Sequence, residues 1–463
     1  MAASSAEDIR RNRGAFPFSN QRSMPVRLGQ LRNSVIRLIY NLLWPIGLLV
    51  FLPGYLVKMF RRGGYRRKFG QRFGIYDAHL RARLHWKKSF WLHAVSVGEV
   101  TIALKLARQI RLLKPDQHCV LTTTTTTGFA FANQSAPDWI EVMYSPLDFW
   151  PVMRRAFATI SPKAVILVEA EVWPNFVAEA HTREIPIALV NARLSPRSEK
   201  RFRMFRGFVA PTFRLLDAIC VQNLEDIERW KAIGVEEGKI SHVGSIKYDP
   251  ENVEIDPELP AAVLAGFGVE KRAVIFGGST HNGEEKVLAE VFRALRREFV
   301  DLLLVLAPRH TERTAEIRRD LEGIGFRVAL RSQSPVPDPS LDCLLIDSTG
   351  ELRDWYGVAT LAFIGKSLVA RGGQNPAEAI LAGKPVVFGP HMENFAALAN
   401  ALLTGHGAIQ VNSPTELRRA MANLLANPDD REEIVQNARK ALDAHRGATA
   451  RTARLMVDLA FAR

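Results

Sequence analysis

The stretch Phe363–Glu378 reads FIGKSLVARGGQNPAE, and it indicates an α/β domain with a ligand site at a strand end. The apolar run Ala359–Ile364 predicts a strand that leads into a glycine-rich loop. Asn375 is a good N-cap for a following helix, and Pro376 suits its first position because proline has no N–H to waste. Free N–H groups and the positive dipole end of such a helix suit a phosphate. With Glu378 placed to accept hydrogen bonds from ribose hydroxyls, we interpret the unit as a nucleotide site; the alternative is an ordinary strand-to-helix turn.

Short apolar runs alternate with amphipathic stretches in two series, and this alternation predicts two doubly wound α/β domains. The first series predicts strands at Ser89–Val95, His118–Thr123, Trp139–Tyr144, Ala164–Glu169, Ile185–Asn191, Asp217–Gln222 and Lys239–Val243. The second series predicts strands at Arg272–Gly277, Leu302–Ala307, Phe326–Leu330, Cys343–Asp347, Ala359–Ile364, Lys384–Gly389 and Ala408–Val411. A polar, proline-bearing stretch separates them. We therefore expect one domain at 61–248, a linker at 249–262 and a second domain with C-terminal helices at 263–463.

The positive charge of the chain is concentrated near its N-terminus. Of the net charge of +14, nearly all lies in residues 1–90, which hold 18 Lys and Arg against three acidic residues. These residues flank Leu38–Val57, an uncharged apolar segment of about the length that spans a bilayer. We expect a disordered basic extension at 1–30 and a membrane-anchoring segment at 31–60. Because the charge is confined to these flanks, nucleic-acid binding is excluded.

The prolines and basic residues around the apolar segment leave two membrane arrangements open. Pro45 and Pro53 interrupt the segment, so it is either a single span or a kinked insertion into one leaflet. A cluster of five basic residues follows at once, and such clusters are attracted to anionic headgroups: Arg61, Arg62, Arg66, Arg67 and Lys68. The predicted partner is therefore an anionic membrane surface.

Three motifs of the first domain carry candidate catalytic groups. HAVSVGE ends at Glu99, where a carboxylate after a strand and a glycine can serve as a general base. EAEVWPN begins at Glu169 and puts two carboxylates, Glu169 and Glu171, near the same cleft, and VGSIKYD brings Lys247 close to the linker. The structural alternatives are a helix-initiating Glu99, a capping Glu169 and a surface Lys247.

Taken in order along the chain, the motifs resemble those of the 3-deoxy-D-manno-octulosonic acid (Kdo) transferases of lipopolysaccharide assembly. The matching pieces are HAVSVGE (93–99), EAEVWPN (169–175), VNARLS (190–195), VGSIKYD (243–249), GGSTHNGEE (277–285), APRHTER (307–313), DSTGEL (347–352), FIGKSLVARGGQNPAEA (363–379) and GPHMENF (389–395). Two residues depart from the family pattern. Gln374 replaces a frequent His, and Thr349 replaces a frequent Met.

The resemblance implies a GT-B type fold, with two Rossmann-like domains and a cleft between them, preceded by a hydrophobic membrane-anchoring helix. It implies transfer of Kdo from CMP-Kdo to a lipid A precursor, with Glu99 as general base and with Glu169 and Lys247 steadying the transition state. The implied CMP contacts are Pro308, Arg309, Thr349, Gly350, Glu351, Asn375, Pro376, Ala377 and Glu378. The expected location is the cell inner membrane, with the catalytic domains on the cytoplasmic side.

No metal and no cofactor are expected, because the chain lacks the Asp-x-Asp motif with which other transferases bind metal and diphosphate. Two other readings of the sequence remain. One is a GT-B transferase or epimerase acting on another nucleotide sugar, and the other is a membrane-surface binding protein without catalysis. The apolar segment argues against a soluble epimerase, and the three candidate catalytic residues argue against loss of catalysis.

Overall fold

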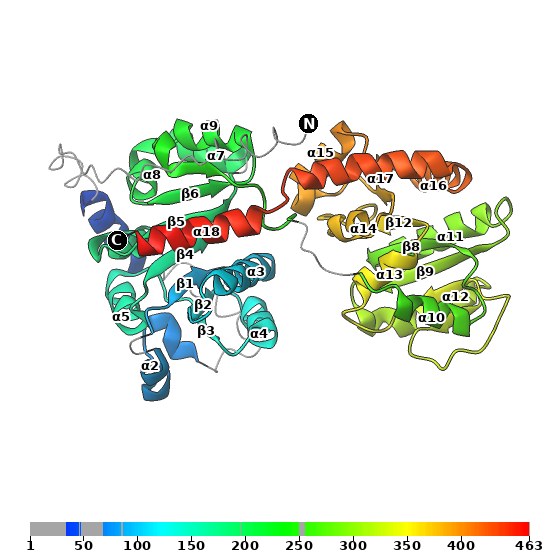
Figure 1. The fold of residues 1–463 in the computed structure, drawn as a ribbon, viewed down its shortest axis with the longest axis horizontal. Coiled ribbons are helices and arrows are strands. Elements are labelled where there is room, and N and C mark those ends of the chain that lie inside the picture. Colours follow the sequence, from blue (N-terminus) through cyan, green and yellow to red (C-terminus); the bar gives the residue numbers. More distant parts are fainter. Residues whose placement is uncertain are drawn as a thin grey trace, which may run out of the picture.

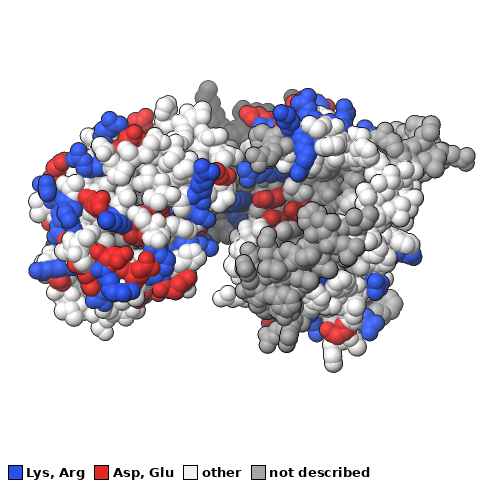
Figure 2. Space-filling view, turned by 180° about the vertical axis from the view of Figure 1, so that it is seen from behind, with Lys and Arg blue, Asp and Glu red and all other residues white. Residues whose placement is uncertain are grey.

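The computed structural model describes residues 34–45, 47, 68–84, 87–194, 196–249 and 255–462. They form two lobes, and each lobe is built on a seven-stranded parallel sheet with helices on both faces (Figure 1). The strand orders are β3-β2-β1-β4-β5-β6-β7 and β10-β11-β9-β8-β12-β13-β14. Charged side chains of both signs gather where the lobes meet (Figure 2). The two predicted doubly wound α/β domains are confirmed.

Every strand begins within two residues of its predicted start. The N-terminal sheet comprises β1 (Phe90–His93), β2 (Cys119–Thr123), β3 (Ile140–Tyr144), β4 (Ala164–Val168), β5 (Ile187–Ala192), β6 (Ala218–Val221) and β7 (Ile240–His242). The C-terminal sheet comprises β8 (Ala273–Thr280), β9 (Leu302–Pro308), β10 (Val328–Leu330), β11 (Cys343–Leu345), β12 (Leu361–Ile364), β13 (Val386–Phe388) and β14 (Ile409–Gln410). The central strands are buried along their whole length, which is why they read as unbroken apolar runs.

Helices connect the strands on both faces of each sheet. Those of the N-terminal half are η1 (Phe69–Phe73), α2 (Ala78–Leu84), α3 (Val97–Leu113), α4 (Thr126–Ser135), α5 (Trp150–Ile160), α6 (Pro174–Thr182), α7 (Pro196–Met204), α8 (Arg206–Phe213), α9 (Leu224–Ala232) and η2 (Glu237–Lys239). Those of the C-terminal half are α10 (Glu258–Gly266), α11 (Glu284–Leu295), η3 (Thr311–Arg313), α12 (Thr314–Gly323), α13 (Leu352–Val358), α14 (Ala377–Leu381), η4 (Glu393–Phe395), α15 (Ala396–Thr404), α16 (Pro414–Ala426), α17 (Pro428–Asp443) and α18 (Ala448–Phe461).

The strand orders place a topological switch point at the centre of each sheet. In the N-terminal sheet it lies between β1 and β4, and in the C-terminal sheet between β8 and β12. Connections leave these neighbouring strands in opposite directions, so a crevice opens beyond their carboxyl ends. The crevice of each sheet is therefore where a ligand is expected.

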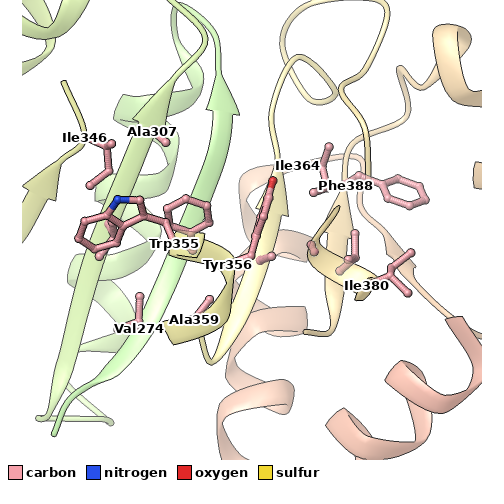
Figure 3. Close-up of a cluster of buried hydrophobic side chains, with 14 of the residues drawn as sticks. Val274, Ala307, Ile346, Trp355, Tyr356, Ala359, Ile364, Ile380 and Phe388 are labelled. Carbon is pink, nitrogen blue, oxygen red and sulfur yellow. The ribbon is translucent and has the colours of Figure 1, made fainter. Parts of the chain in front are cut away.

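An aromatic pair on α13 anchors the C-terminal core beside its switch point (Figure 3). Trp355 and Tyr356 are fully buried, and the ring of Tyr356 meets Phe276 edge-on at 4.9 Å between centroids. Gly278 leaves room for this tyrosine, because a Cβ there would lie 2.1 Å from the Tyr356 hydroxyl oxygen. Aromatic packing thus dictates the glycine at the end of β8.

The last helix belongs to the other lobe. Our domain division placed residues 263–463 in the C-terminal domain, but α18 lies across the N-terminal lobe and packs against α3 (Figure 1). Its Ala453 and Met456 share a hydrophobic core with Phe90 and Val100. The C-terminal segment is made of separate helices, because α17 ends at Asp443 and α18 begins at Ala448. The apolar face of α18 covers one face of the N-terminal sheet, which is why the chain returns.

Two other expected boundaries differ from the structure. Helix α10 begins at Glu258, so ordered structure starts inside the predicted linker 249–262. Asp249, at the start of that linker, is fixed rather than free, because its carboxylate accepts hydrogen bonds from the Gly447 and Thr449 N–H groups at the start of α18, both at 2.7 Å. The two chain segments that join the lobes are therefore tied to each other.

Part of the expected membrane-anchoring segment 31–60 is a helix at residues 34–45, mounted on the N-terminal lobe. The Asn41 and Asn175 side-chain amides exchange hydrogen bonds of 2.9 and 3.0 Å, and Trp44 stacks on Phe149 at 5.2 Å. None of the helices in the described part of the chain is long and apolar enough to cross a membrane. Residues 48–60, like the basic extension 1–30, lie outside the described residues.

Candidate active site

Glu99 lies in the first turn of α3, just beyond the end of β1. The Ser96 hydroxyl donates to Glu99 Oε1 at 2.8 Å, and the Val95 N–H donates to Oε2 at 2.9 Å. In return the Glu99 N–H donates to Ser96 Oγ at 3.4 Å, so Ser96 caps the helix and the Glu99 side chain reaches back to its first residues. The helix-initiating role weighed from the sequence is therefore real. The Glu99 carboxylate can still accept a proton or a further hydrogen bond, because each of its oxygens keeps a further lone pair.

Glu169 stands at the matching position after β4, on the other side of the switch point. Its backbone adopts φ of 60°, a left-handed conformation that a residue with a Cβ rarely holds. The Glu169 N–H donates to the Val190 carbonyl at 3.0 Å, which fixes the turn. Burial raises the pKa of Glu169 and the nearby charge of Glu99 raises it further, while Lys247 and Arg193 oppose them. The two carboxylates thus share one electrostatic environment.

Glu171 adds a third carboxylate, to which the sequence analysis gave no catalytic role. Burial, followed by the charge of Glu99, raises the pKa of Glu171 to about 7, against a hydrogen bond from Trp173 that lowers it. The Trp173 indole N–H donates to Glu171 Oε2 at 3.0 Å. Only the Glu-x-Glu spacing of the motif could have pointed to it. Within the described residues, no group of three or more His, Cys, Asp and Glu side chains is arranged to hold a metal ion.

Lys247 bridges the two lobes. Its ammonium donates to the Asn394 carbonyl at 3.1 Å and lies 3.9 Å from the centre of the Phe395 ring. Burial lowers the pKa of Lys247, the charge of Glu169 opposes that shift, and Arg193 adds to it. A lysine from the N-terminal lobe therefore reaches the C-terminal lobe beside Glu169, rather than lying free on the surface.

The predicted nucleotide helix is α14, which begins at Ala377. Asn375 Oδ1 accepts a hydrogen bond from the Ala377 N–H at 3.1 Å, so the asparagine caps the helix as expected, although Pro376 is the residue directly before it. Burial raises the pKa of Glu378, and the nearby Arg353, Asn375 and Arg309 lower it. Glu378 is therefore a largely enclosed carboxylate with two arginines close to it.

The remaining predicted CMP contacts lie on neighbouring strand ends. Pro308 ends β9, and the Arg309 N–H donates to the Thr280 carbonyl at 3.0 Å. Thr349 and Gly350 are exposed on the loop before α13. The Glu351 carboxylate is already occupied, because Arg331 donates to both of its oxygens at 3.1 and 3.3 Å. Arg331 therefore fixes the orientation of the Glu351 carboxylate.

A cleft of about 380 Å³ lies between the lobes, and several of the predicted site residues line it. The predicted residues along its wall are Lys247, Asn375, Ala377 and Glu378, with Gly98 next to Glu99. The other predicted residues do not line it: Glu99, Glu169, Pro308, Arg309, Pro376 and the 349–351 loop. Three cations of this wall are not among the predicted site residues: Lys105, Arg108 and Arg353. The spacing of Lys105 and Arg108 along one face of α3 was the available signal.

Two parallel-sheet α/β lobes that face each other across a cleft define the GT-B type of architecture. Anabaena Alr3699/HepE in complex with UDP has a similar fold, with a TM-score of 0.51 and 12% identity over 80% of this chain and 99% of that chain. A second similar fold is the glycotransferase of kitacinnamycin, with a TM-score of 0.50 and 18% identity over 80% of this chain and 98% of that chain. At such identities the likeness concerns the fold alone.

Sequence relatives decide the family. Residues 67–250 match the family model described as 3-deoxy-D-manno-octulosonic-acid transferase (kdotransferase). The 3-deoxy-D-manno-octulosonic acid transferase of Haemophilus influenzae is 33% identical over 84% of this chain and 90% of its own. The enzyme of the same name from Bordetella pertussis is 34% identical over 86% of this chain and 93% of its own. This chain therefore belongs to the 3-deoxy-D-manno-octulosonic acid transferase family.

Proposed function

We propose that this protein is an inverting glycosyltransferase that moves Kdo from CMP-Kdo to a lipid A precursor, lipid IVA, in lipopolysaccharide synthesis. The observation that carries the proposal is the cleft itself. Lys247 and the residue next to Glu99 face Asn375 and Glu378 across it, in a chain of the Kdo transferase family. A sugar donor held on one lobe and an acceptor held on the other would meet there.

Glu99 acts as the general base on the acceptor hydroxyl. Its carboxylate takes the proton as the hydroxyl oxygen forms a bond to the anomeric carbon of Kdo. The bond from that carbon to the phosphate oxygen breaks, and CMP leaves with the electron pair. The hydrogen bonds from Val95 and Ser96 keep the carboxylate oriented, as a general base requires.

Cations and a second carboxylate stabilise the charges that develop. Lys247 and Arg309 favour the departing phosphate, because fixed positive groups in a shielded cleft interact strongly with negative charge. Glu169 lies close enough to Lys247 for each to shift the other's pKa, and its carboxylate favours an oxocarbenium-like sugar. The reaction proposed here uses no metal and no cofactor.

CMP binds on the C-terminal lobe. Glu378 accepts hydrogen bonds from the ribose hydroxyls, and the backbone around Asn375, Pro376 and Ala377 faces the phosphate. Pro308 and Arg309 lie at the end of β9, one strand further along the same sheet edge beyond β8. Backbone atoms of Thr349, Gly350 and Glu351 contact the base, which agrees with the engagement of the Glu351 side chain by Arg331.

The acceptor is a membrane lipid, so the protein works at an anionic membrane surface, on the cytoplasmic side of the cell inner membrane. The helix at 34–45 favours insertion into one leaflet over a full span. One of its faces is fixed to the lobe through Asn41 and Trp44. Five of its apolar side chains are exposed, each 44–65% accessible: Val35, Leu38, Ile39, Leu42 and Leu43. A stripe of this kind buries itself in the headgroup boundary.

The decisive experiment is incubation of the protein with CMP-Kdo and a tetra-acylated lipid A precursor, followed by mass spectrometry of the lipid. We expect a mass increase by whole Kdo residues. Parallel reactions with uridine-linked sugars test the alternative of a GT-B transferase or epimerase with another substrate. Turnover of those sugars, with none of CMP-Kdo, would overturn the proposal.

A further inference from the structure

Glu284 is a fully buried carboxylate that joins the two loops of the C-terminal switch point. It is the first residue of α11 and has 0% of its surface exposed. Its Oε2 accepts from the N–H groups of His281 at 2.9 Å and Lys366 at 2.7 Å. Its Oε1 accepts from the N–H groups of Ser367 at 2.9 Å and Leu368 at 3.0 Å. One side chain thus satisfies four backbone donors.

Those donors come from loops that are pressed together without space for side chains. A Cβ on Gly365, after β12, would lie 2.2 Å from the carbonyl oxygen of Ser279, at the end of β8. Ser279 and Lys366 both hold left-handed backbones, with φ of 54° and 58°. Conformations of this kind persist only where surrounding contacts fix them. Glu284 provides such contacts, and a buried charge is tolerated because each carboxylate oxygen accepts two N–H groups.

We call the hydrogen bonds from Glu284 to residues 281 and 366–368 the clamp. Two further backbone hydrogen bonds connect it to the proposed donor site. Lys366 gives its N–H to Glu284, and its carbonyl accepts from the Gly373 N–H at 2.8 Å, two residues before Asn375. The carbonyl of Gly372, the residue before Gly373, accepts a hydrogen bond from the Asn394 N–H at 2.8 Å. The Asn394 carbonyl in turn accepts the hydrogen bond from the Lys247 ammonium. These contacts connect Glu284 to the N-terminal cap of α14 and, through Lys247, to the N-terminal lobe.

We propose that Glu284 is a positioning residue for the CMP-sugar donor, which rests on the function proposed above. Its carboxylate fixes the backbone of residues 366–368 and the turn at His281. The loop then holds Asn375 and Glu378 where they meet the nucleotide. Glu284 itself does not touch the donor, because it is sealed beneath the loops.

The test compares Glu284→Gln with Glu285→Gln. The amide introduced by the first substitution would turn one NH₂ group towards backbone N–H donors, so the loop must rearrange. The neighbouring Glu285 is a matched control, because it is also buried but pairs with Arg313 at 3.1 Å rather than with residues 366–368. We expect E284Q to raise the Kd for CMP and the KM for CMP-Kdo by about tenfold or more, since hydrogen bonds to a charged group are lost. The KM for the lipid acceptor should change little.

A merely structural role would lower the melting temperature of both variants and leave donor affinity unchanged in the folded fraction. CMP binding by folded E284Q as tight as in the wild type would therefore overturn the proposal. Hydrogen exchange provides a second readout, with faster exchange expected at the amides of 366–368 in E284Q only. If E284Q does not fold, Glu284→Asp, with a shorter carboxylate, should raise the Kd in the same direction. If the wild type itself bound no cytidine nucleotide, the proposed function would fall, while the exchange data would still report on the clamp.

Discussion

At the scale of single residues, the site combines groups that serve the fold and the chemistry together. Glu99 takes part in the N-terminal cap of α3 and is also the proposed base. The same hydrogen bonds that start the helix aim the carboxylate, so its position needs no further support. The motif was ambiguous in the sequence because one side chain can fill both roles.

Glu99→Gln is expected to lower the turnover number by about 10²–10⁴-fold, the usual contribution of a general base. Glutamine preserves the shape and can still accept a hydrogen bond from Ser96, so α3 should stay capped. CMP affinity, measured by calorimetry, should match the wild type because the proposed nucleotide site is on the other lobe. A variant that turns over at near-normal rate would remove Glu99 from the mechanism.

Glu171 should make stability depend on pH. Its pKa is raised from 4.5 to about 7 in the folded protein, so between these values the folded state binds the proton more tightly than the unfolded chain does. The free energy of unfolding contributed by this group is therefore present below pH 4.5 and is lost as the pH rises through about 7. We expect the melting temperature of the wild type to fall relative to that of Glu171→Gln between about pH 5 and pH 8. Parallel profiles for the two proteins would show that Glu171 does not titrate in this range.

At the scale of elements, short segments acquire their shape from the loops packed against them. Helix α14 has five residues, too few to be stable alone, and is held by its asparagine cap and by buried Ala379 and Ile380. Its proposed role is to present Glu378 to the ribose.

Glu378→Ala is therefore expected to weaken CMP binding by about 1.5–3 kcal/mol, the contribution of a charged acceptor. Glu416 offers a matched control, since it lies in the first turn of α16 and accepts from the Asn412 N–H at 2.8 Å, away from the cleft. Glu416→Ala should reduce stability without changing CMP affinity. Equal CMP affinity in the Glu378 variant and the wild type would remove the glutamate from the nucleotide site.

The helix at 34–45 makes a separate prediction about membranes. Replacing Leu38 and Leu42 by Gln should reduce co-sedimentation with anionic vesicles at least about tenfold, because each leucine that enters an apolar phase contributes about 1.5–3 kcal/mol. The melting temperature should hardly change, since both side chains already face outward. Leu112→Gln is the control, because this leucine is 75% exposed on α3. Unchanged vesicle binding by the double variant would show that the stripe serves another purpose.

At the scale of the whole molecule, local pattern predicted the strands well and the long-range contacts poorly. Central parallel strands such as β4 are apolar throughout, so each is legible by itself. The clamp between Glu284 and residues 366–368 joins positions more than 80 apart, and no periodicity encodes it. The pairing of Glu351 with Arg331 and the docking of Asn41 on Asn175 were invisible for the same reason. The sequence predicted candidate site residues where a motif coincides with the end of a strand. It did not predict the distant residues that form hydrogen bonds with them.

The return of α18 to the N-terminal lobe has a consequence for biosynthesis. The C-terminal domain is, in topological terms, an insertion between residue 249 and the last helix. A ribosome delivers the N-terminal strands first, yet their sheet lacks the cover of α18 until the last helix emerges, while domains otherwise fold in order of synthesis. The C-terminal lobe can be complete while the N-terminal lobe is not. Closure of the N-terminal core, and with it the cleft, is therefore deferred until α18 has been synthesised.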